Sequence, residues 1–450
     1  MAVAAAGTFV YQQVRHTGPA HPAKWDSRVT PIVQFVETTR GLRFRHPVYI
    51  DLLDAAEYAA RAGTVLAGDA SLATRTKDHG DLLDAFGFAT AYRPTADDAN
   101  LSYDTDLGTY SPVTDRITLR GTSLTAGLRV VLAHELTHAL QAQHFDIRLG
   151  RSDDFATRSI AEADAMRIGQ SYLDTLPQAD RDRVAAENTM DTAEAVQLSR
   201  TPWPMIEFRY APFWLGPGLL QPTLARGGNA GVDQLFHNAP TEAELISRWR
   251  ADARVVTPTV NPAAVPVDVP KGATLVQAST PLSLMQVLVM LDAWLPWSMA
   301  RGALDHWTGG RYAAYRPSKG GTLCVAVTAT FSAAPEAFAT AISSWATAAG
   351  STARPTVTAT DVAFLACARG ADAPSPPTPL IGPSTEILLE NAAIPATVTD
   401  ASTAEPYLCT VRAMIDNTAI SSLLIKTPLA PAEQAVVDLA RAVARQSCGS

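Results

Sequence analysis

The segment from Leu132 to Leu140, Leu-Ala-His-Glu-Leu-Thr-His-Ala-Leu, constrains this chain more than any other part of it. It lies in an apolar pattern of helical period, so His134 and His138 are expected one turn apart on one face of a helix. Two imidazoles placed in this way can bind one metal ion. Glu135 follows His134 by about 100° of helical rotation and can reach a water at that metal. The segment therefore predicts a zinc site with two histidine ligands and a carboxylate base.

A catalytic zinc site needs a third protein ligand, and the sequence offers two candidates. His144 has the spacing of the pattern H-E-x-x-H-x-x-G-x-x-H, in which a glycine lets the chain turn back to the ion. Here Gln141 replaces that glycine within a run of good helix formers, so a continuing helix would turn His144 away. The other candidate, Glu162, is expected on the next helix. We predict Glu162 as the third ligand and keep His144 as the alternative.

The residues from His134 to Asp146, HELTHALQAQHFD, resemble a family of bacterial gluzincin-type zinc metallopeptidases that carry HELTHALQDQHF followed by a short E-G-D/E-A segment. The corresponding segment here runs from Glu162 to Ala165. The resemblance extends more weakly over residues 25–370, including an upstream segment from Trp25 to Leu53. The chain departs from the family at Ala142, where the family has Asp, at Ala163, where it has Gly, and in its long C-terminal tail. None of these departures removes a ligand.

The resemblance implies an α+β, zincin-like (gluzincin) catalytic region, largely helical with a small sheet, followed by a mixed α/β C-terminal region. It implies that His134, His138 and Glu162 bind Zn²⁺ and that Glu135 is the general base of peptide-bond hydrolysis in a peptide or protein substrate. An acidic neighbour of Glu162 is expected to orient a ligand imidazole. A non-catalytic binding protein that keeps the metal only for folding is the competing class.

Proline-rich stretches predict the division of the chain. The expected parts are a tail at 1–24, a catalytic region at 25–254, a linker at 255–281, a mixed α/β region at 282–372, a Pro-rich linker at 373–384 and a C-terminal strand and helix tail at 385–450. The strand expected from Arg116 to Arg120 lies just before the motif helix. We expect this strand to pair with an extended substrate. Tyr210, His237 and His306 are candidates for stabilising an oxyanion, and the sequence does not choose among them.

The composition of the chain indicates which binding partners and which cellular location to expect. The chain has 450 residues and a net charge of -8 without a basic cluster, which argues against nucleic acid or an anionic membrane as partner. No apolar run approaches the roughly 20 residues of a membrane span. Few lysines and a predicted protease activity favour an extracellular or cell-envelope location, while a cytoplasmic one stays open. The sequence does not predict an oligomeric state.

All four cysteines lie in the C-terminal third, outside any metal-type spacing. We expect Cys324 to pair with Cys367 and Cys409 with Cys448, because these are neighbours along the chain; four free thiols and the other pairings stay open. A strand is expected near Cys409, from Tyr407 to Arg412, with a helix after it. The same order of elements is expected around Cys324, which suggests a repeated unit.

Overall fold

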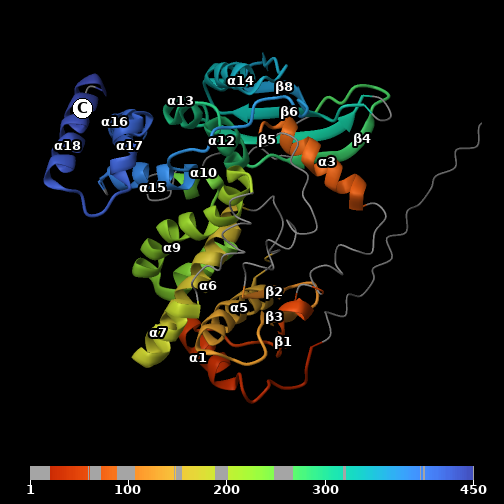
Figure 1. Cartoon of the computed structure of the whole chain (residues 1–450), viewed down its shortest axis with the longest axis vertical. Helices are drawn as coiled ribbons and strands as arrows, with labels where there is room; N and C mark the ends of the chain where they lie inside the picture. The colour runs from red at the N-terminus through yellow and green to blue at the C-terminus, as the bar shows by residue number, and fades with distance from the viewer. Residues whose placement is uncertain are drawn as a thin grey trace, which may run out of the picture.

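The described residues form two separate β-sheets with helices around and between them (Figure 1). A computed structural model describes residues 21–58, 60, 72–88, 107–145, 147, 155–187, 201–247, 267–317, 321–395, 397–398 and 401–448. Over these ranges the chain belongs to the α+β class, as expected. No helix within them combines the length and the apolar character needed to cross a bilayer.

The first sheet has three strands in the order β1-β3-β2, with bounds β1 (Tyr49–Leu53), β2 (Gly108–Ser111) and β3 (Arg116–Arg120). β3 pairs in parallel with β1 and antiparallel with β2. Its Ile117 and Leu119 are fully buried and pack in a core shared with α1 (Thr30–Arg40) and α5 (Ala126–His144). α1 ends at Gly41, whose φ of 75° suits glycine better than residues with a Cβ.

Three helices follow the first sheet and surround the motif. α5 begins after Thr125, whose side chain accepts a hydrogen bond from the backbone N–H of Leu128 at 3.2 Å and so caps the helix. α6 (Phe155–Thr175) packs along α5, and α7 (Gln178–Glu187) packs against the first half of α5. Glu187 of α7 accepts hydrogen bonds from Thr125 and from the backbone of Gly127. These contacts hold the N-terminal end of the motif helix.

The long helix α9 (Trp203–His237) covers the other side of α6. Gly216 lets the two helices approach closely, because a Cβ at this position would lie 1.9 Å from the carbonyl oxygen of Ser159. The helix kinks at Gly228, whose φ is 58° and ψ is -154°. A short helix, α10 (Glu242–Ile246), follows with a capping box formed by Thr241 and Glu244.

The second sheet has five strands in the order β4-β5-β6-β8-β7, all paired antiparallel. Its strands are β4 (Thr274–Pro281), β5 (Trp307–Arg316), β6 (Cys324–Phe331), β7 (Thr356–Val357) and β8 (Asp361–Cys367). The helices packed with it are α3 (Leu72–Ala85), α12 (Leu284–Asp292), α13 (Trp297–Gly302) and α14 (Pro335–Ala349). The linker expected at 255–281 is therefore wrong for Thr274–Pro281, which pairs with β5; residues 255–266 lie outside the described ranges.

The C-terminal part is helical, with α15 (Pro383–Ala393), α16 (Ala401–Asp416), α17 (Thr418–Leu424) and α18 (Pro431–Cys448) at one side of the molecule (Figure 1). The strand expected from Tyr407 to Arg412 is wrong, because these residues lie within α16. The suggested repeat around Cys324 and Cys409 therefore does not exist. The apolar residues of α16 lie on one side at helical spacing, and its Leu408 and Val411 are buried by neighbouring helices.

Both expected disulfides are present. Cys324 and Cys367 are directly opposite each other on β6 and β8, with their Cα atoms 3.9 Å apart. Cys409 and Cys448 join α16 to the end of α18, with Cα atoms 5.8 Å apart. Each bridge therefore lies within its own structural neighbourhood, as the order of the cysteines along the chain predicts.

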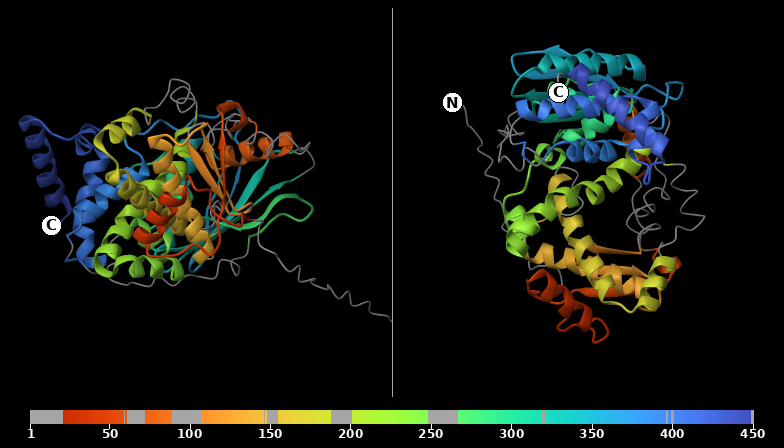
Figure 2. Two further views of the ribbon diagram at one scale, coloured as in Figure 1. Left: turned by 90° about the horizontal axis from the view of Figure 1, so that it is seen from below. Right: turned by 90° about the vertical axis from the view of Figure 1, so that its left-hand side faces the viewer.

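Two hydrophobic cores meet at α6, which lies between the two sheets (Figure 2). Ile168 of α6 belongs to the core of the first sheet, while Ile160 belongs to the core that also contains the second sheet. α9 and the second sheet thus share one core across the expected boundary near residues 255–281. α6 is consequently packed on two sides, against α5 and against α9.

Three buried carboxyl groups, Glu207, Asp292 and Glu386, lie close together where α9, α12 and α15 meet. Glu207 accepts a hydrogen bond from the backbone N–H of Ser384 at 2.6 Å. Burial raises the pKa of Glu386 well above its ordinary range, and the neighbouring Asp292 carboxylate acts in the same direction. The folded protein therefore keeps a proton on this pair that an unfolded chain would release.

This proton makes the stability depend on pH. Above the ordinary Glu pKa of 4.5 the unfolded chain binds fewer protons, so the free energy of unfolding falls as pH rises. Glutamine at position 386 is neutral without a bound proton, so the free energy of unfolding of Glu386→Gln should not share this fall. Its difference from wild type should grow in favour of the variant as pH rises, by at most about 1.4 kcal/mol per pH unit. Urea denaturation at several pH values from about 5 to 9 measures this difference.

Glu390→Gln, on the same helix, is the matched control. Glu390 accepts hydrogen bonds from Arg412 at 2.7 Å and Trp297 at 2.9 Å, so this variant should lose stability throughout the range. A difference between Glu386→Gln and wild type that stays constant with pH would show that Glu386 is ionised in the folded protein.

Candidate metal centre

His134, His138 and Glu162 converge in the structure, although 24 positions separate the last two along the chain. The Nε2 atoms of the two histidines are 3.0 Å apart. Oε2 of Glu162 lies 3.2 Å from Nε2 of His138 and 3.4 Å from Nε2 of His134. The three predicted ligands are therefore brought together, and they are the one group of this kind among the described residues.

The local sequence explains how the side chains meet. His134 and His138 are one turn apart on α5 and point the same way, with their rings edge to face at 4.6 Å between centroids. Glu162 lies on the face of α6 that packs against α5. The amide of Gln141 on α5 donates to the carbonyl oxygen of Ala161 at 3.1 Å, which is a direct contact between the two helices beside Glu162. The site is thus formed by helix packing and not by a loop.

The donor set fits zinc. Two imidazole nitrogens and one carboxylate oxygen are ligands that zinc binds at about 2.0–2.2 Å, and in a tetrahedron such atoms are roughly 3.3 Å apart. The three observed separations of 3.0, 3.2 and 3.4 Å lie close to that value. The side chains are 7% to 19% exposed, so the group is largely enclosed and still reachable from solvent.

A buried chain of hydrogen bonds holds His138. Its Nδ1 lies 3.0 Å from Oε1 of Gln141, and the amide of Gln141 donates to the Ala161 carbonyl at 3.1 Å and to Oδ2 of Asp164 at 3.0 Å. Both partners of the Gln141 amide are acceptors, so its oxygen must face His138, and Nδ1 must carry the proton. In the neutral imidazole the lone pair is therefore on Nε2, the atom that faces His134 and Glu162.

Asp164, at the centre of this chain, is fully buried and paired with arginines. Nε of Arg40, from α1, lies 2.8 Å from its Oδ2, and Arg167 donates to its Oδ1 at 2.9 Å. Arg40 also donates to Asp233 of α9 at 2.5 Å. Asp164, the acidic neighbour of Glu162, thus contacts the His138 imidazole only through Gln141. Gln141 could have been found from its position three residues after His138; no sequence signal points to Arg40.

Gln141→Leu should weaken zinc binding by about 10- to 100-fold, because it removes the acceptor that fixes the orientation and protonation of the His138 ring. Competition with a chromogenic chelator measures the affinity. Gln143→Leu is the matched control two residues further along α5, since Gln143 bonds to Arg45 and His46 and not to His138. Equal zinc affinity in Gln141→Leu and wild type would exclude the orienting role.

The charges of the group attract one another. Burial disfavours the charged form of His138, but the Glu162 carboxylate outweighs this effect and raises the pKa of His138 to about 9. Burial also disfavours the charged form of Glu162, and the two histidines outweigh it, so the pKa of Glu162 lies well below its ordinary range. The carboxylate is therefore ionised, as metal binding requires.

Glu135 is next to this group and is 7% exposed. Its negative charge acts on His138, yet its carboxylate has no hydrogen-bond or ion-pair partner among the residues that the structure describes. Gly108 of β2 lies directly against it, because a Cβ at Gly108 would be 3.4 Å from Cγ of Glu135 and 2.6 Å from Val131. Glu135 therefore lies between the metal-binding group and an edge strand of the sheet.

His144 is outside the metal-binding group. α5 continues to His144 as expected, and the ring nitrogen Nε2 of His144 lies 2.7 Å from the carbonyl oxygen of Arg43.

The three candidates for stabilising an oxyanion, Tyr210, His237 and His306, contact residues other than the candidate ligands. Tyr210 stacks on Trp214 of its own helix, His237 packs on Phe145, and the carbonyl of His306 accepts a hydrogen bond from Ser332. None of these three makes a hydrogen bond, ion pair or ring contact with His134, His138 or Glu162 within the described part of the chain.

The strand expected to pair with substrate needs correction. Arg116–Arg120 is a strand, but β3 is the central one, and its backbone groups are bonded to β1 on one side and β2 on the other. It cannot accept a further strand. β2 is at the edge of the sheet and faces α5 through Gly108. Within the described ranges, β2 is the strand whose position suits pairing with a peptide near Glu135.

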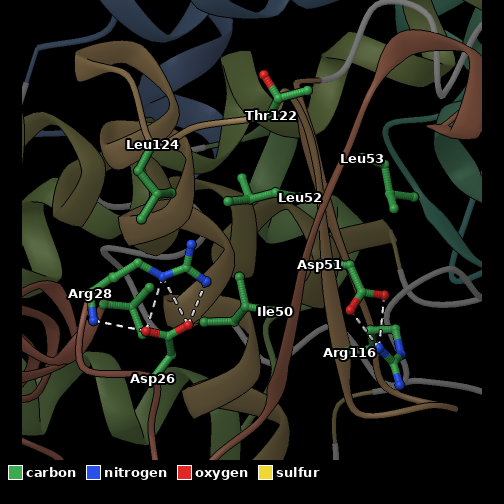
Figure 3. Close-up of a pocket in the computed structure, with 10 residues that line it drawn as sticks. Asp26, Arg28, Ile50, Asp51, Leu52, Leu53, Arg116, Thr122 and Leu124 are labelled. Atoms are coloured by element: carbon green, nitrogen blue, oxygen red, sulfur yellow. Dashed lines mark hydrogen bonds and ion pairs between the residues drawn. The ribbon is translucent and has the colours of Figure 1, made fainter.

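A cavity of about 550 Å³ lies at the opposite edge of this sheet, along β1 (Figure 3). Residues of β1 line it together with Thr122 and Leu124, which precede α5. Ion pairs border it, Arg28 with Asp26 and Arg116 with Asp51. None of the metal-binding residues lines this cavity, so it is separate from the candidate centre.

Comparison of the chain with protein-family models, with curated proteins and with solved structures finds no match.

Proposed function

We propose that this protein is a zinc-dependent peptidase that hydrolyses peptide bonds in peptide or protein substrates. One observation carries the proposal. Two imidazole nitrogens and a carboxylate oxygen from two helices lie within 3.4 Å of one another, beside a Glu135 carboxylate that has no partner in the described part of the chain. A site built only to stabilise the fold has no need of this extra carboxylate.

His134, His138 and Glu162 would hold the zinc. Zinc bound there would supply a Lewis acid that polarises the scissile carbonyl and lowers the pKa of water toward neutrality. Glu135 would accept the proton of the attacking water and then donate it to the leaving amine. Gln141 and Asp164 keep the His138 ring in the tautomer that binds metal.

The first sheet supports a peptide substrate. An extended peptide that added to the edge of β2 through backbone hydrogen bonds would run beside Gly108, which lies against Glu135. This mode of binding tolerates many side chains. The motif helix beside a small sheet, followed by a helix that lends a carboxylate, also supports a zincin-like (gluzincin) architecture for residues 25–254.

The two disulfides support an oxidising compartment, and we infer an extracellular or cell-envelope location. Disulfides of this kind are rare in the cytosol of most organisms. Thiol counting on protein isolated under non-reducing conditions tests this inference, since four free thiols would place the protein in a reducing compartment.

Metal analysis combined with a peptidase assay tests the proposed function. The purified protein should contain about one zinc per chain and degrade an unfolded protein, and a chelator should stop the degradation until zinc is restored. Bound zinc without any hydrolysis would favour the competing class, a binding protein stabilised by its metal. Degradation that continues in chelator would exclude a metal-dependent mechanism.

A further inference from the structure

An arginine borders the metal-binding group on its solvent side. Arg158 is one turn before Glu162 on α6, and its side chain is 35% exposed, against 12% for Glu162. Its Nε lies 3.9 Å from Oε1 of Glu162, the oxygen opposite to the one that faces the two histidines. Arg158 therefore places a positive charge beside the candidate centre.

The guanidinium of Arg158 is not used to hold the structure together. A separation of 3.9 Å is too long for a hydrogen bond, and across the described residues Arg158 makes no other ion pair and no hydrogen bond. The nearby Arg40 and Arg167 differ, because each is bonded to Asp164. An arginine has five N–H donors in a planar arrangement that matches a carboxylate.

The charges around the candidate centre indicate that Arg158 can attract an anion. The two negative charges of Glu135 and Glu162 are neutralised when a divalent cation is bound, and Arg158 then leaves a net positive charge at the rim. A partly exposed guanidinium in such a place attracts anions and binds carboxylates in a bidentate manner.

We propose that Arg158 is a specificity-determining residue that binds a carboxylate of the substrate close to the scissile bond. This inference rests on the proposed peptidase function and names its substrate class, peptides with a negative charge within about two residues of the cleaved bond. An extended residue spans about 3.3–3.6 Å, so one or two residues cover the distance between the metal ligands and the guanidinium. The carboxylate comes either from an Asp or Glu side chain or from a free C-terminus.

Four matched peptides distinguish the two sources. They share one sequence and carry either Glu or Gln next to the cleaved bond, and either a free or an amidated C-terminus near it. The zinc-loaded wild type should show a kcat/KM at least about tenfold higher for the peptide that carries the recognised carboxylate than for its neutral partner. Arg158→Ala should abolish this ratio, and Arg158→Lys should keep part of it.

Arg183→Ala is the control, since Arg183 lies on α7, is 69% exposed and pairs with Asp180 away from the metal ligands. It should keep the wild-type ratio. A second readout avoids turnover. In zinc-loaded Glu135→Gln protein, calorimetric titration should show that Arg158→Ala weakens binding of the charged peptide at least about tenfold and leaves that of the neutral peptide unchanged.

The outcomes are distinct. Equal cleavage of all four peptides by wild type would show that the inference is wrong. So would an Arg158→Ala protein in which zinc affinity and all four rates fall alike, because Arg158 would then only support Glu162. Either result leaves the proposed peptidase function intact. If the protein holds no zinc and neither binds nor cleaves any of the peptides, the proposed function fails and the inference fails with it.

Discussion

Glu135→Gln should retain about one zinc per chain and lose peptide hydrolysis by roughly 10²- to 10⁴-fold. Glutamine keeps the shape of the side chain but cannot accept the proton of the attacking water. Zinc binding should persist because the three ligand atoms belong to His134, His138 and Glu162, and Glu135 is not among them. Zinc content and the initial rate on an unfolded protein, measured on the same preparation, check both parts.

Glu336→Gln is the matched control for this experiment. Glu336 is exposed in the first turn of α14, so the same chemical change there should alter neither zinc content nor rate. A Glu135→Gln protein with full zinc and undiminished turnover would contradict the proton-transfer role. Loss of zinc in this variant would instead show that Glu135 belongs to the ligand set.

Glu162→Ala should lower the affinity for zinc by more than about 100-fold, whereas His144→Ala should leave it nearly unchanged. The reason is geometric. Oε2 of Glu162 lies 3.2 and 3.4 Å from the two imidazole nitrogens, while the ring of His144 contacts the carbonyl oxygen of Arg43. Competition titration with a chelator of known affinity measures the loss in both variants.

Glu162→Gln guards against a simple folding defect. It preserves the packing of the partly buried side chain on α6 and removes only its charge, so circular dichroism should match wild type while zinc affinity still falls. If His144→Ala removes the metal and Glu162→Ala does not, the third ligand is His144, and the protein belongs to the alternative class of metal-dependent peptidases.

The shared face of His134 and His138 could be predicted from the sequence because their arrangement is local, whereas the position of Glu162 beside them depends on the packing of α6 on α5. Residues four apart on a helix share a face wherever that helix lies, so His134 and His138 needed no knowledge of the fold. The absence of a glycine at Gln141 likewise predicted that α5 continues to His144, as it does. The two disulfides could also be predicted from the sequence, because each joins cysteines that are neighbours along the chain.

Other features were beyond sequence reasoning because they depend on which elements pack together. Periodicity predicts a strand at Arg116–Arg120, but only the sheet order shows that β3 is the central strand of the described sheet and that β1 and β2 lie at its two edges. The segment from Tyr407 to Arg412 was read as a strand, yet burial by neighbouring helices makes it part of α16. Short apolar runs fit either period, and tertiary packing decides between them.

The sequence by itself determined that His134 and His138 share one helix face with Glu135 beside them, since residue type and helical spacing suffice for this, and the resemblance to a known family pointed to Glu162. Only the tertiary structure decided how that centre is supported and what surrounds it. Arg40 reaches Asp164 from 124 positions away, and Arg158 lies beside Glu162 with no hydrogen bond to any residue in the described part of the chain. The physical reason is that a helix fixes relations between residues three or four apart, whereas contacts between helices depend on the packing of the whole core.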